Sequence, residues 1–204
     1  MSFYSGIRTF FSPIIKVLFN VHIKGSENVP DEGGLLICPN HISASDVIFV
    51  TMAVKNRDIH YMAKAELFKI PLLSQFMKGM GAFPIKRGAG DIAAIKKTIT
   101  YLRDGEVVGM FPQGTRYSGV HPRESEIKPG VGMIAWRSEA TILPVAIITK
   151  KYKIALFRRV DVIIGKPLSC KELGFESGSH DEQRAAADKV FEEMLKLHEG
   201  AEKK

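Results

Sequence analysis

GGLLICPNHISASDVIFVTMAV, residues 33–54, combines a strand pattern, a turn signal and a helix pattern in direct succession. It opens with a short apolar run that ends at Pro39 and Asn40. A helical pattern of apolar residues then follows Ser45, which can act as an N-cap. The stretch therefore predicts a strand, a turn and a helix, which is the unit from which α/β domains are built.

The rest of the chain repeats this alternation. The stretch DIAAIKKTITYLRDG predicts a helix, because it begins at an acidic residue, Asp91, and ends at Gly105. Five further runs that are rich in β-branched or aromatic residues and bounded by Gly or Pro predict strands: IHYMAKAELF, GAFPIKRG, EVVGMFPQGTR, ATILPVAIIT and YKIALFRRVDVIIGKPL. We expect Pro144 to interrupt the fourth of these. The predicted fold is a single α/β domain, with a mainly parallel or mixed sheet flanked by helices and a terminal helix from about residue 179 to 204.

Composition and charge exclude several classes of protein. The 204 residues suffice for one domain with a full core, and 45% hydrophobic with 25% charged residues argue against bulk disorder and a polytopic membrane protein. The net charge of +7 favours anionic partners. No nucleic-acid-binding motif accompanies it, so we expect no nucleic acid. Cys38 and Cys170 are the two cysteines; with no secretory signal and no paired ligand spacing, we expect reduced thiols in the cytosol and no metal.

The N-terminus predicts an amphipathic helix over residues 1–22, followed by the main domain over residues 23–204. One face of this helix gathers the apolar side chains Phe3, Ile7, Phe10, Phe11, Ile14, Ile15 and Leu18. Arg8, Ser12, Pro13 and Lys16 interrupt the run, so it does not have the roughly 20 apolar residues that a membrane span needs. The helix can lie in a membrane interface or pack on the core of its own domain; the aromatic residues with flanking cations favour the interface.

His41 and Asp46 stand in the turn between the first predicted strand and its helix. On one continuous helix, residues five apart point in directions that differ by roughly 140°, so the two side chains would not meet. They can meet if His41 lies in the turn and Asp46 in the first turn of the helix. Such a pair suits general-base catalysis, because the carboxylate orients the imidazole that takes the proton. The spacing alone also fits a hydrogen-bonded histidine and an acidic residue that stabilises a helix N-terminus.

Two further segments carry groups suited to phosphate. In FPQGTR, residues 111–116, Gly114 allows a tight turn, Thr115 offers a hydroxyl and Arg116 presents a planar guanidinium. In GAFPIKRG, Lys86 and Arg87 offer a second cationic contact. Taken singly, the first segment is also what a plain turn requires, and the second is also typical of a solvated surface.

In this order, the segments NHISASD, FPIKR, FPQGTR and ILPV resemble the four motif blocks of the glycerolipid acyltransferase family. The resemblance spans residues 23–168 and is to the bacterial 1-acyl-glycerol-3-phosphate acyltransferases. It implies that His41 deprotonates the free sn-2 hydroxyl of the acceptor while Asp46 orients it. The hydroxyl then attacks an acyl thioester directly, without a cofactor or a metal, and the product is phosphatidic acid.

The resemblance also implies a substrate-binding set. Arg116, with Lys86 or Arg87, would hold the phosphate of the acceptor, and Gly114 and Thr115 would shape that pocket. The segment around Pro144 would line the acyl or donor side. One departure is Gln113, where the family usually has Glu; the amide keeps an acceptor oxygen but carries no negative charge.

The implied partners are lysophosphatidic acid, a donor that is acyl-CoA or acyl carrier protein, and a membrane surface. Five lysines are candidates for contacts with an anionic donor: Lys64, Lys69, Lys78, Lys96 and Lys97. We expect a peripheral protein at the cytoplasmic face of the cell membrane. Two alternatives stay open: an acyltransferase for another lysophospholipid, and a non-catalytic binder of anionic membranes or phosphorylated ligands.

Overall fold

Strands from the whole length of the chain assemble into one seven-stranded sheet in the computed structural model, which describes residues 3–86 and 91–202. The order is β1-β7-β6-β2-β5-β3-β4, and every neighbouring pair is parallel except β6 and β7. The predicted mixed α/β sheet is thereby confirmed. The strands are β1 (Val21–Lys24), β2 (Leu35–Pro39), β3 (Ile59–Lys64), β4 (Phe83–Ile85), β5 (Val107–Gly109), β6 (Thr141–Thr149) and β7 (Val160–Ile164).

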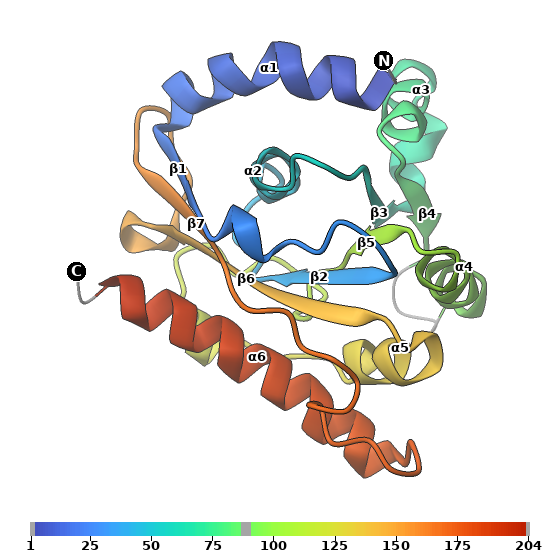
Figure 1. Ribbon diagram of the computed structural model, residues 1–204. Coiled ribbons are helices and arrows are strands. Elements are labelled where there is room, and N and C mark those ends of the chain that lie inside the picture. The colour runs from blue at the N-terminus through green and yellow to red at the C-terminus, as the bar shows by residue number, and fades with distance from the viewer. Residues whose placement is uncertain (1–2, 87–90, 203–204) are drawn as a thin grey trace.

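Helices cover both faces of this sheet (Figure 1). On one face lie α1 and α2, and their apolar side chains join those of β1, β2 and β7 in one core cluster. On the other face α4, α5 and α6 form a second cluster with β2, β5 and β6. The helices are α1 (Phe3–Phe19), α2 (Asp46–Ala53), α3 (Pro71–Gly79), α4 (Ile92–Arg103), α5 (Gly130–Ser138) and α6 (His180–Glu202).

The parallel strands β2, β5, β3 and β4 are neighbours, so their carboxyl ends meet at one edge of the sheet. Ligands of α/β sheets usually bind at this edge. The turn with His41 follows β2, the FPQGTR segment follows β5, and Lys86 follows β4. The topology therefore brings together three motifs that lie up to about seventy residues apart in the sequence.

The two terminal helices lie on opposite faces of the sheet and are seen side-on in Figure 1. The predicted terminal helix is α6, and it buries Val190, Phe191, Met194 and Leu195. On α1, Ile15 and Phe19 pack on the core, and the ring of Phe19 meets the ring of Phe49 edge to face with centroids 5.4 Å apart.

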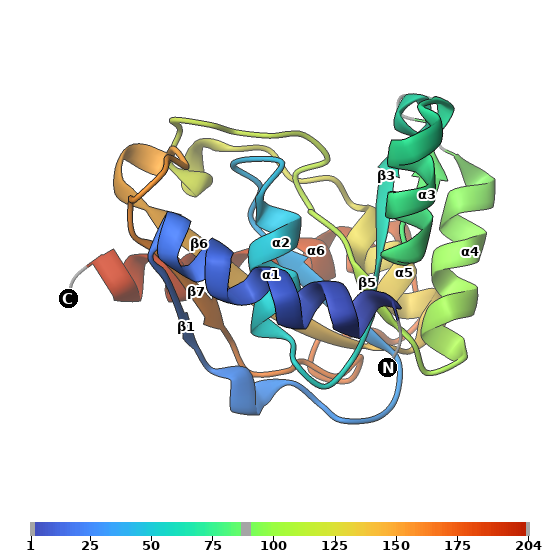
Figure 2. The same ribbon diagram turned by 90° about the horizontal axis from the view of Figure 1, so that it is seen from above.

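The outer side of α1 stays exposed at Phe10 (69%), Ile14 and Val17 (73%). The two alternatives for the N-terminal helix are therefore not exclusive, because one side packs on the core and the other is apolar and solvent-facing. Figure 2 shows α1 crossing over α2 toward α3. Among the described residues, no helix is long and apolar enough to cross a membrane. The predicted boundary at residue 22 falls within β1.

Two strand predictions were wrong in detail. In YKIALFRRVDVIIGKPL only Val160–Ile164 is a strand; before it, Leu156 and Phe157 are exposed in a loop, while Ile154 packs on the core. Leu156 and Phe157 lack a neighbouring strand at this point, because β7 begins only where it pairs with β1. Pro144 does not interrupt β6, which runs on to Thr149 and keeps Pro144 opposite Cys38 of β2.

Candidate functional site

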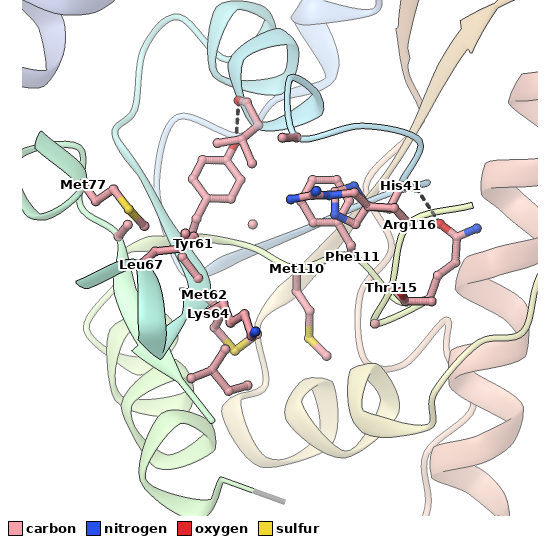
Figure 3. Close-up of a pocket in the computed structure, with 18 of the residues that line it drawn as sticks. His41, Tyr61, Met62, Lys64, Leu67, Met77, Met110, Phe111, Thr115 and Arg116 are labelled. Carbon is pink, nitrogen blue, oxygen red and sulfur yellow. Dashed lines mark hydrogen bonds between the residues drawn. The ribbon is translucent and has the colours of Figure 1, made fainter. Parts of the chain in front are cut away.

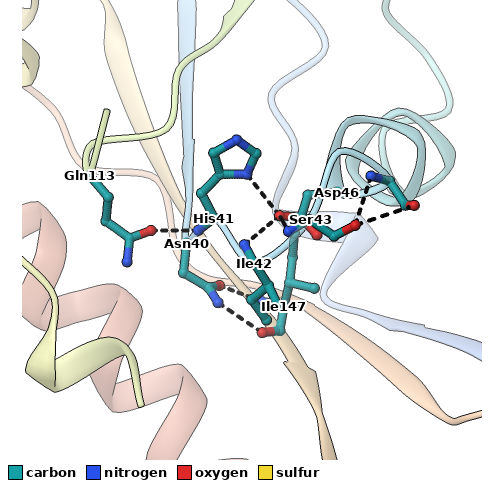
Figure 4. A network of polar contacts seen from close by, with 8 residues as sticks. Asn40, His41, Ile42, Ser43, Asp46, Gln113 and Ile147 are labelled. Carbon is teal, nitrogen blue, oxygen red and sulfur yellow. Dashed lines mark hydrogen bonds and ion pairs between the residues drawn. The ribbon is translucent and has the colours of Figure 1, made fainter. Parts of the chain in front are cut away.

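His41 and Asp46 meet, because the structure adopts the arrangement in which their spacing allows it: His41 lies in the turn after β2 and Asp46 at the first position of α2. The Nδ1 atom of His41 lies 2.8 Å from Oδ2 of Asp46. Figure 4 draws this contact as a dashed line between the two side chains. The side chains are buried, with exposed fractions of 6% and 0%. With Asp46 as the acceptor of a hydrogen bond from Nδ1–H, the lone pair of the neutral imidazole lies on Nε2.

One oxygen of Asp46 organises the whole turn. Oδ2 also accepts the backbone N–H of Ile42 at 2.6 Å and that of Ser43 at 2.8 Å. Ser45 occupies the predicted N-cap position, but its side chain forms no capping hydrogen bond. The carboxylate of Asp46 closes the turn from inside the helix instead, where the partial positive charge of the helix N-terminus favours it.

Asn40 ties the same turn to the centre of the sheet. Its Nδ2 donates to the carbonyl of Ile147 at 2.9 Å, and its Oδ1 accepts the N–H of Ile147 at 2.7 Å. The amide thus replaces a pair of strand hydrogen bonds where β2 ends beside β6. This fixes the direction in which the chain leaves the sheet, and so the position of His41.

Gln113 holds His41 from the side of β5. Its buried Oε1 accepts the backbone N–H of His41, and its Nε2 donates to Oγ of Ser125 at 2.6 Å. Ser125 passes the chain on by donating to the carbonyl of Pro122 at 2.6 Å. The ring of Phe111 stacks on the imidazole, with centroids 3.9 Å apart and an angle of 20°. Two side chains of the FPQGTR segment, Phe111 and Gln113, therefore position the histidine.

A cavity of about 1190 Å³ opens beside His41. Figure 3 shows Tyr61, Met62, Leu67 and Met77 on its side toward β3 and α3, away from His41 and Thr115. Ser12 and Ile15 of α1 also line the cavity. Gly109 lies where β5 passes Tyr61, and a Cβ there would stand 2.2 Å from the tyrosine ring, so this side of the cavity requires glycine.

The predicted substrate-binding residues separate into two groups. Gly114, Thr115 and Arg116 are exposed and line the cavity next to His41, and Gly114 adopts φ 68°, as a tight turn requires. Lys86 lines the same cavity from the end of β4, whereas Arg87 lies outside the described residues. Gln113 reaches the cavity wall, but its amide is engaged with His41 and Ser125.

Two cations of the cavity were not predicted as phosphate contacts, Lys64 at the end of β3 and Lys128 before α5. The sequence makes Lys64 a candidate only for contacts with an anionic donor. No sequence signal marks Lys128, which reaches the cavity because its N–H donates to the carbonyl of Pro112 at 2.9 Å. Among the other predicted donor lysines, Lys97 lies over the rings of Phe83 and Tyr101. Pro144 does not line the cavity.

Asp91 anchors the cationic edge. Its Oδ2 accepts the N–H of Lys86 at 2.8 Å, and its Oδ1 caps α4 by accepting the N–H of Ala94 at 3.1 Å, as the helix prediction requires. These backbone hydrogen bonds, first that from Lys86, lower the pKa of Asp91 below its ordinary value. Asp91 therefore stays ionised and fixes the backbone that carries Lys86.

Cysteine and metal chemistry have little support in this site. Cys38 and Cys170 are unpaired thiols, and burial raises the pKa of Cys38, so it carries no thiolate near neutral pH. Within residues 3–86 and 91–202, no group of three or more His, Cys, Asp or Glu side chains could hold a metal ion.

Comparison with known proteins agrees with the fold and the motifs. A 1-acyl-sn-glycerol-3-phosphate acyltransferase of Bacillus subtilis is 32% identical over 185 residues, covering 90% of each chain. An enzyme of the same name from Streptococcus pneumoniae is 31% identical over 160 residues, which are 76% of this chain and 58% of that one. The crystal structure of the 1-acyl-sn-glycerophosphate acyltransferase PlsC of Thermotoga maritima has the same fold, with a TM-score of 0.70 at 24% identity over 98% of this chain and 79% of that one.

The family model named Acyltransferase matches residues 20–148. This segment contains the His41–Asp46 pair, Lys86 and the FPQGTR turn. The match covers well over half of the chain, and together with the Bacillus subtilis relative it identifies the chain as an enzyme that belongs to the acyltransferase family.

Proposed function

We propose that this acyltransferase moves a fatty acyl group from an acyl thioester to the sn-2 hydroxyl of 1-acyl-glycerol-3-phosphate, giving phosphatidic acid. The observation that carries the proposal is the buried His41–Asp46 pair beside a large apolar cavity edged by cations. The names of the relatives from Bacillus subtilis and Streptococcus pneumoniae support the choice of acceptor.

In the proposed reaction His41 is the general base. Nε2 takes the proton of the acceptor hydroxyl as the oxygen attacks the thioester carbonyl carbon. The C–O bond forms, the C–S bond breaks, and the proton on Nε2 passes to the departing sulfur. The carboxylate of Asp46 stabilises the imidazolium between these steps, because Nδ1 lies 2.8 Å from it. General-base catalysis of this kind contributes roughly 10²- to 10⁴-fold in rate.

The acceptor phosphate is proposed to bind at the cationic edge of the cavity. Arg116 supplies a planar guanidinium, and Lys86 and Thr115 supply further donors to phosphate oxygens. The apolar remainder of the cavity suits an acyl chain. Both donor types, acyl-CoA and acyl carrier protein, fit a thioester site with cations at its edge. We expect a donor panel to separate them.

We further propose that the enzyme works as a peripheral protein at the cytoplasmic face of the membrane. The exposed apolar side of α1 is suited to a bilayer interface. Ser12 and Ile15 of the same helix line the cavity, so a lysophospholipid that leaves the bilayer would have only a short path to His41. Both acyl donors are cytosolic molecules, and this supports the choice of face.

The decisive experiment incubates the purified protein with lysophosphatidic acid and either acyl-CoA or acyl carrier protein. We expect release of free thiol and formation of phosphatidic acid. His41→Ala should lower the rate of acyl transfer at least about 10²-fold. His22→Ala is the matched control, because His22 is an exposed histidine of β1 that does not line the cavity.

Two results would contradict the proposal. Turnover with another lysophospholipid and none with lysophosphatidic acid would move the acceptor assignment to a different head group. Lipid binding without any turnover, and indifferent to His41→Ala, would support a non-catalytic binder of anionic membranes instead.

A further inference from the structure

An exposed apolar pair stands on the loop between β6 and β7, outside the cavity. Leu156 is 59% exposed and Phe157 is 72% exposed. Their sequence predicts a buried strand, and their neighbour Ile154 does pack on the core. Solvent-facing leucine and phenylalanine side chains next to one another are costly to keep in water, at about 25 cal/mol for each Å² of apolar surface. The exposure of these two side chains therefore suggests that something outside the folded chain covers them.

Hydrogen bonds fix the conformation of the loop, and the backbone of Phe157 adopts an uncommon conformation. Its φ is 59°, in the left-handed region that bulky side chains seldom adopt. The N–H of Phe157 donates to the carbonyl of Leu18 at the end of α1. The guanidinium of Arg158 donates to the carbonyls of Lys150 and Lys153 at 3.2 and 2.9 Å. Strained residues of this kind persist where the surroundings hold them, and they gather at functional places.

Cations flank the apolar pair in the sequence. Residues 150–161 contain Lys150, Lys151, Lys153, Arg158 and Arg159, and a single acidic residue, Asp161. The carboxylate of Asp161 is paired with Arg159 at 2.7 Å, which leaves the lysines without a carboxylate in their own segment. Apolar and aromatic side chains at a tip, flanked by Lys and Arg, are the pattern of a segment that enters the head-group region of an anionic bilayer.

The loop continues the exposed side of α1. The hydrogen bond from Phe157 to Leu18 joins it to the end of that helix, one residue beyond Val17, which is also exposed. Figures 1 and 2 both show the segment before β7 beside the end of α1 that leads into β1. The exposed apolar side chains of the loop therefore lie near the end of α1 that carries Val17.

We propose that the loop over residues 150–159 is a second membrane contact, in which Leu156 and Phe157 enter an anionic bilayer and the flanking lysines bind its head groups. The inference deepens the proposed membrane placement of α1 and rests on it. A single amphipathic helix can roll about its axis on a surface. A second contact at one end of the helix removes this freedom, and so fixes how the cavity wall formed by Ser12 and Ile15 faces the lipid.

The test uses the variant Phe157→Asn in the full-length protein. Asparagine adopts positive φ far more readily than phenylalanine, so the variant should fold at least as well as the parent. It nevertheless loses the apolar ring. Sedimentation with vesicles of phosphatidylglycerol and phosphatidylcholine measures the partition coefficient. We expect that of the variant to be about tenfold lower than that of the parent. Phe157→Leu keeps an apolar side chain and should bind within about threefold of the parent.

A charge pair tests the lysines. Lys150→Glu should weaken sedimentation with the anionic vesicles and leave binding to pure phosphatidylcholine vesicles unchanged. Lys171→Glu makes the same change of net charge on an exposed lysine that lies before α6, on the other face of the sheet, and is the matched control. Equal losses from both variants would mean that only net charge matters, and would overturn the role of the loop.

Three further outcomes decide the proposal. Parent-like vesicle binding of Phe157→Asn would overturn it. A dimer in solution that Phe157→Asn converts to a monomer, with unchanged vesicle binding, would assign the pair to a contact between two copies of the chain and also overturn it. Acyl transfer is measured separately in detergent solution. Loss of vesicle binding in a chain without transferase activity would support the membrane contact while refuting the proposed reaction.

Discussion

The two ends of the cavity are built on opposite principles. At the reactive end His41, Asp46 and Gln113 are buried, and each forms hydrogen bonds with specific partners. At the other end the cavity is lined by apolar side chains from β3 and α3, among them Met62 and Met77. Methionine is unbranched and adapts its shape to its neighbours. In this enzyme the polar side chains around His41 are therefore held by specific hydrogen bonds, whereas the apolar wall of the cavity can adjust its shape.

We expect the largest effect from Asp46→Asn, which removes only the negative charge from the reactive end of the cavity. In Asp46→Asn the amide oxygen can take the place of Oδ2 and keep the hydrogen bonds to Nδ1 of His41 and to the turn. The imidazolium would lose its carboxylate, so we expect kcat to fall about 10²-fold with little change in melting temperature. Thiol release and thermal unfolding measure the two quantities. An unchanged kcat would show that Asp46 only builds the turn.

Gln113→Leu breaks the same end through the backbone. It leaves the buried N–H of His41 and the hydroxyl of Ser125 without the amide, which costs about 1–3 kcal/mol of stability. We expect kcat to fall about tenfold with an unchanged KM for the acceptor, because the side chain acts through His41. Steady-state kinetics separate the two. A raised KM with a normal kcat would instead assign Gln113 to acceptor binding.

Filling the adjustable end should change selectivity and leave the chemistry intact. Met77→Trp places a large ring in the apolar part of the cavity, so the rate with long acyl chains should fall about tenfold relative to short ones. Competition between donors and acceptors of different chain length measures this ratio. The matched control is Leu72→Trp on the same helix, at a side chain that is 83% exposed and does not line the cavity. Equal shifts in both variants would contradict the assignment.

The smallest effect concerns the cationic edge between the two ends. The pKa of Asp91 is lowered by the N–H groups of Lys86 and Ala94, so the carboxylate stabilises the fold above its ordinary pKa of 3.8. This stabilisation is lost as the pH falls through the lowered value. Asp91→Asn should therefore melt slightly below the parent near pH 7, and the difference should shrink below about pH 4. A difference that is constant with pH would mean that the charge of Asp91 is irrelevant.

Local patterns predicted most of the fold and half of the site. The strand, turn and helix around His41, the Asp91 cap and the terminal helix all depend on neighbours within a few residues, and the structure confirms them. The Gln113–Ser125 chain, Lys128 and the cavity wall from α3 could not be predicted. They arise where segments distant in sequence meet, and no local pattern encodes that meeting.

Side-chain spacing and turn residues were enough to predict the alternation of strands and helices. They left open whether His41 meets Asp46, because Asn40 and Gln113 hold that turn through residues distant in the sequence. Only the tertiary structure decided which apolar residues are covered. Ile154 packs on the core while Phe157, three residues later, faces solvent. On α1, Ile15 and Val17 divide in the same way. Burial depends on whether a segment distant in the sequence packs against a residue, and among the described residues no such segment covers the side chains of Val17 and Phe157.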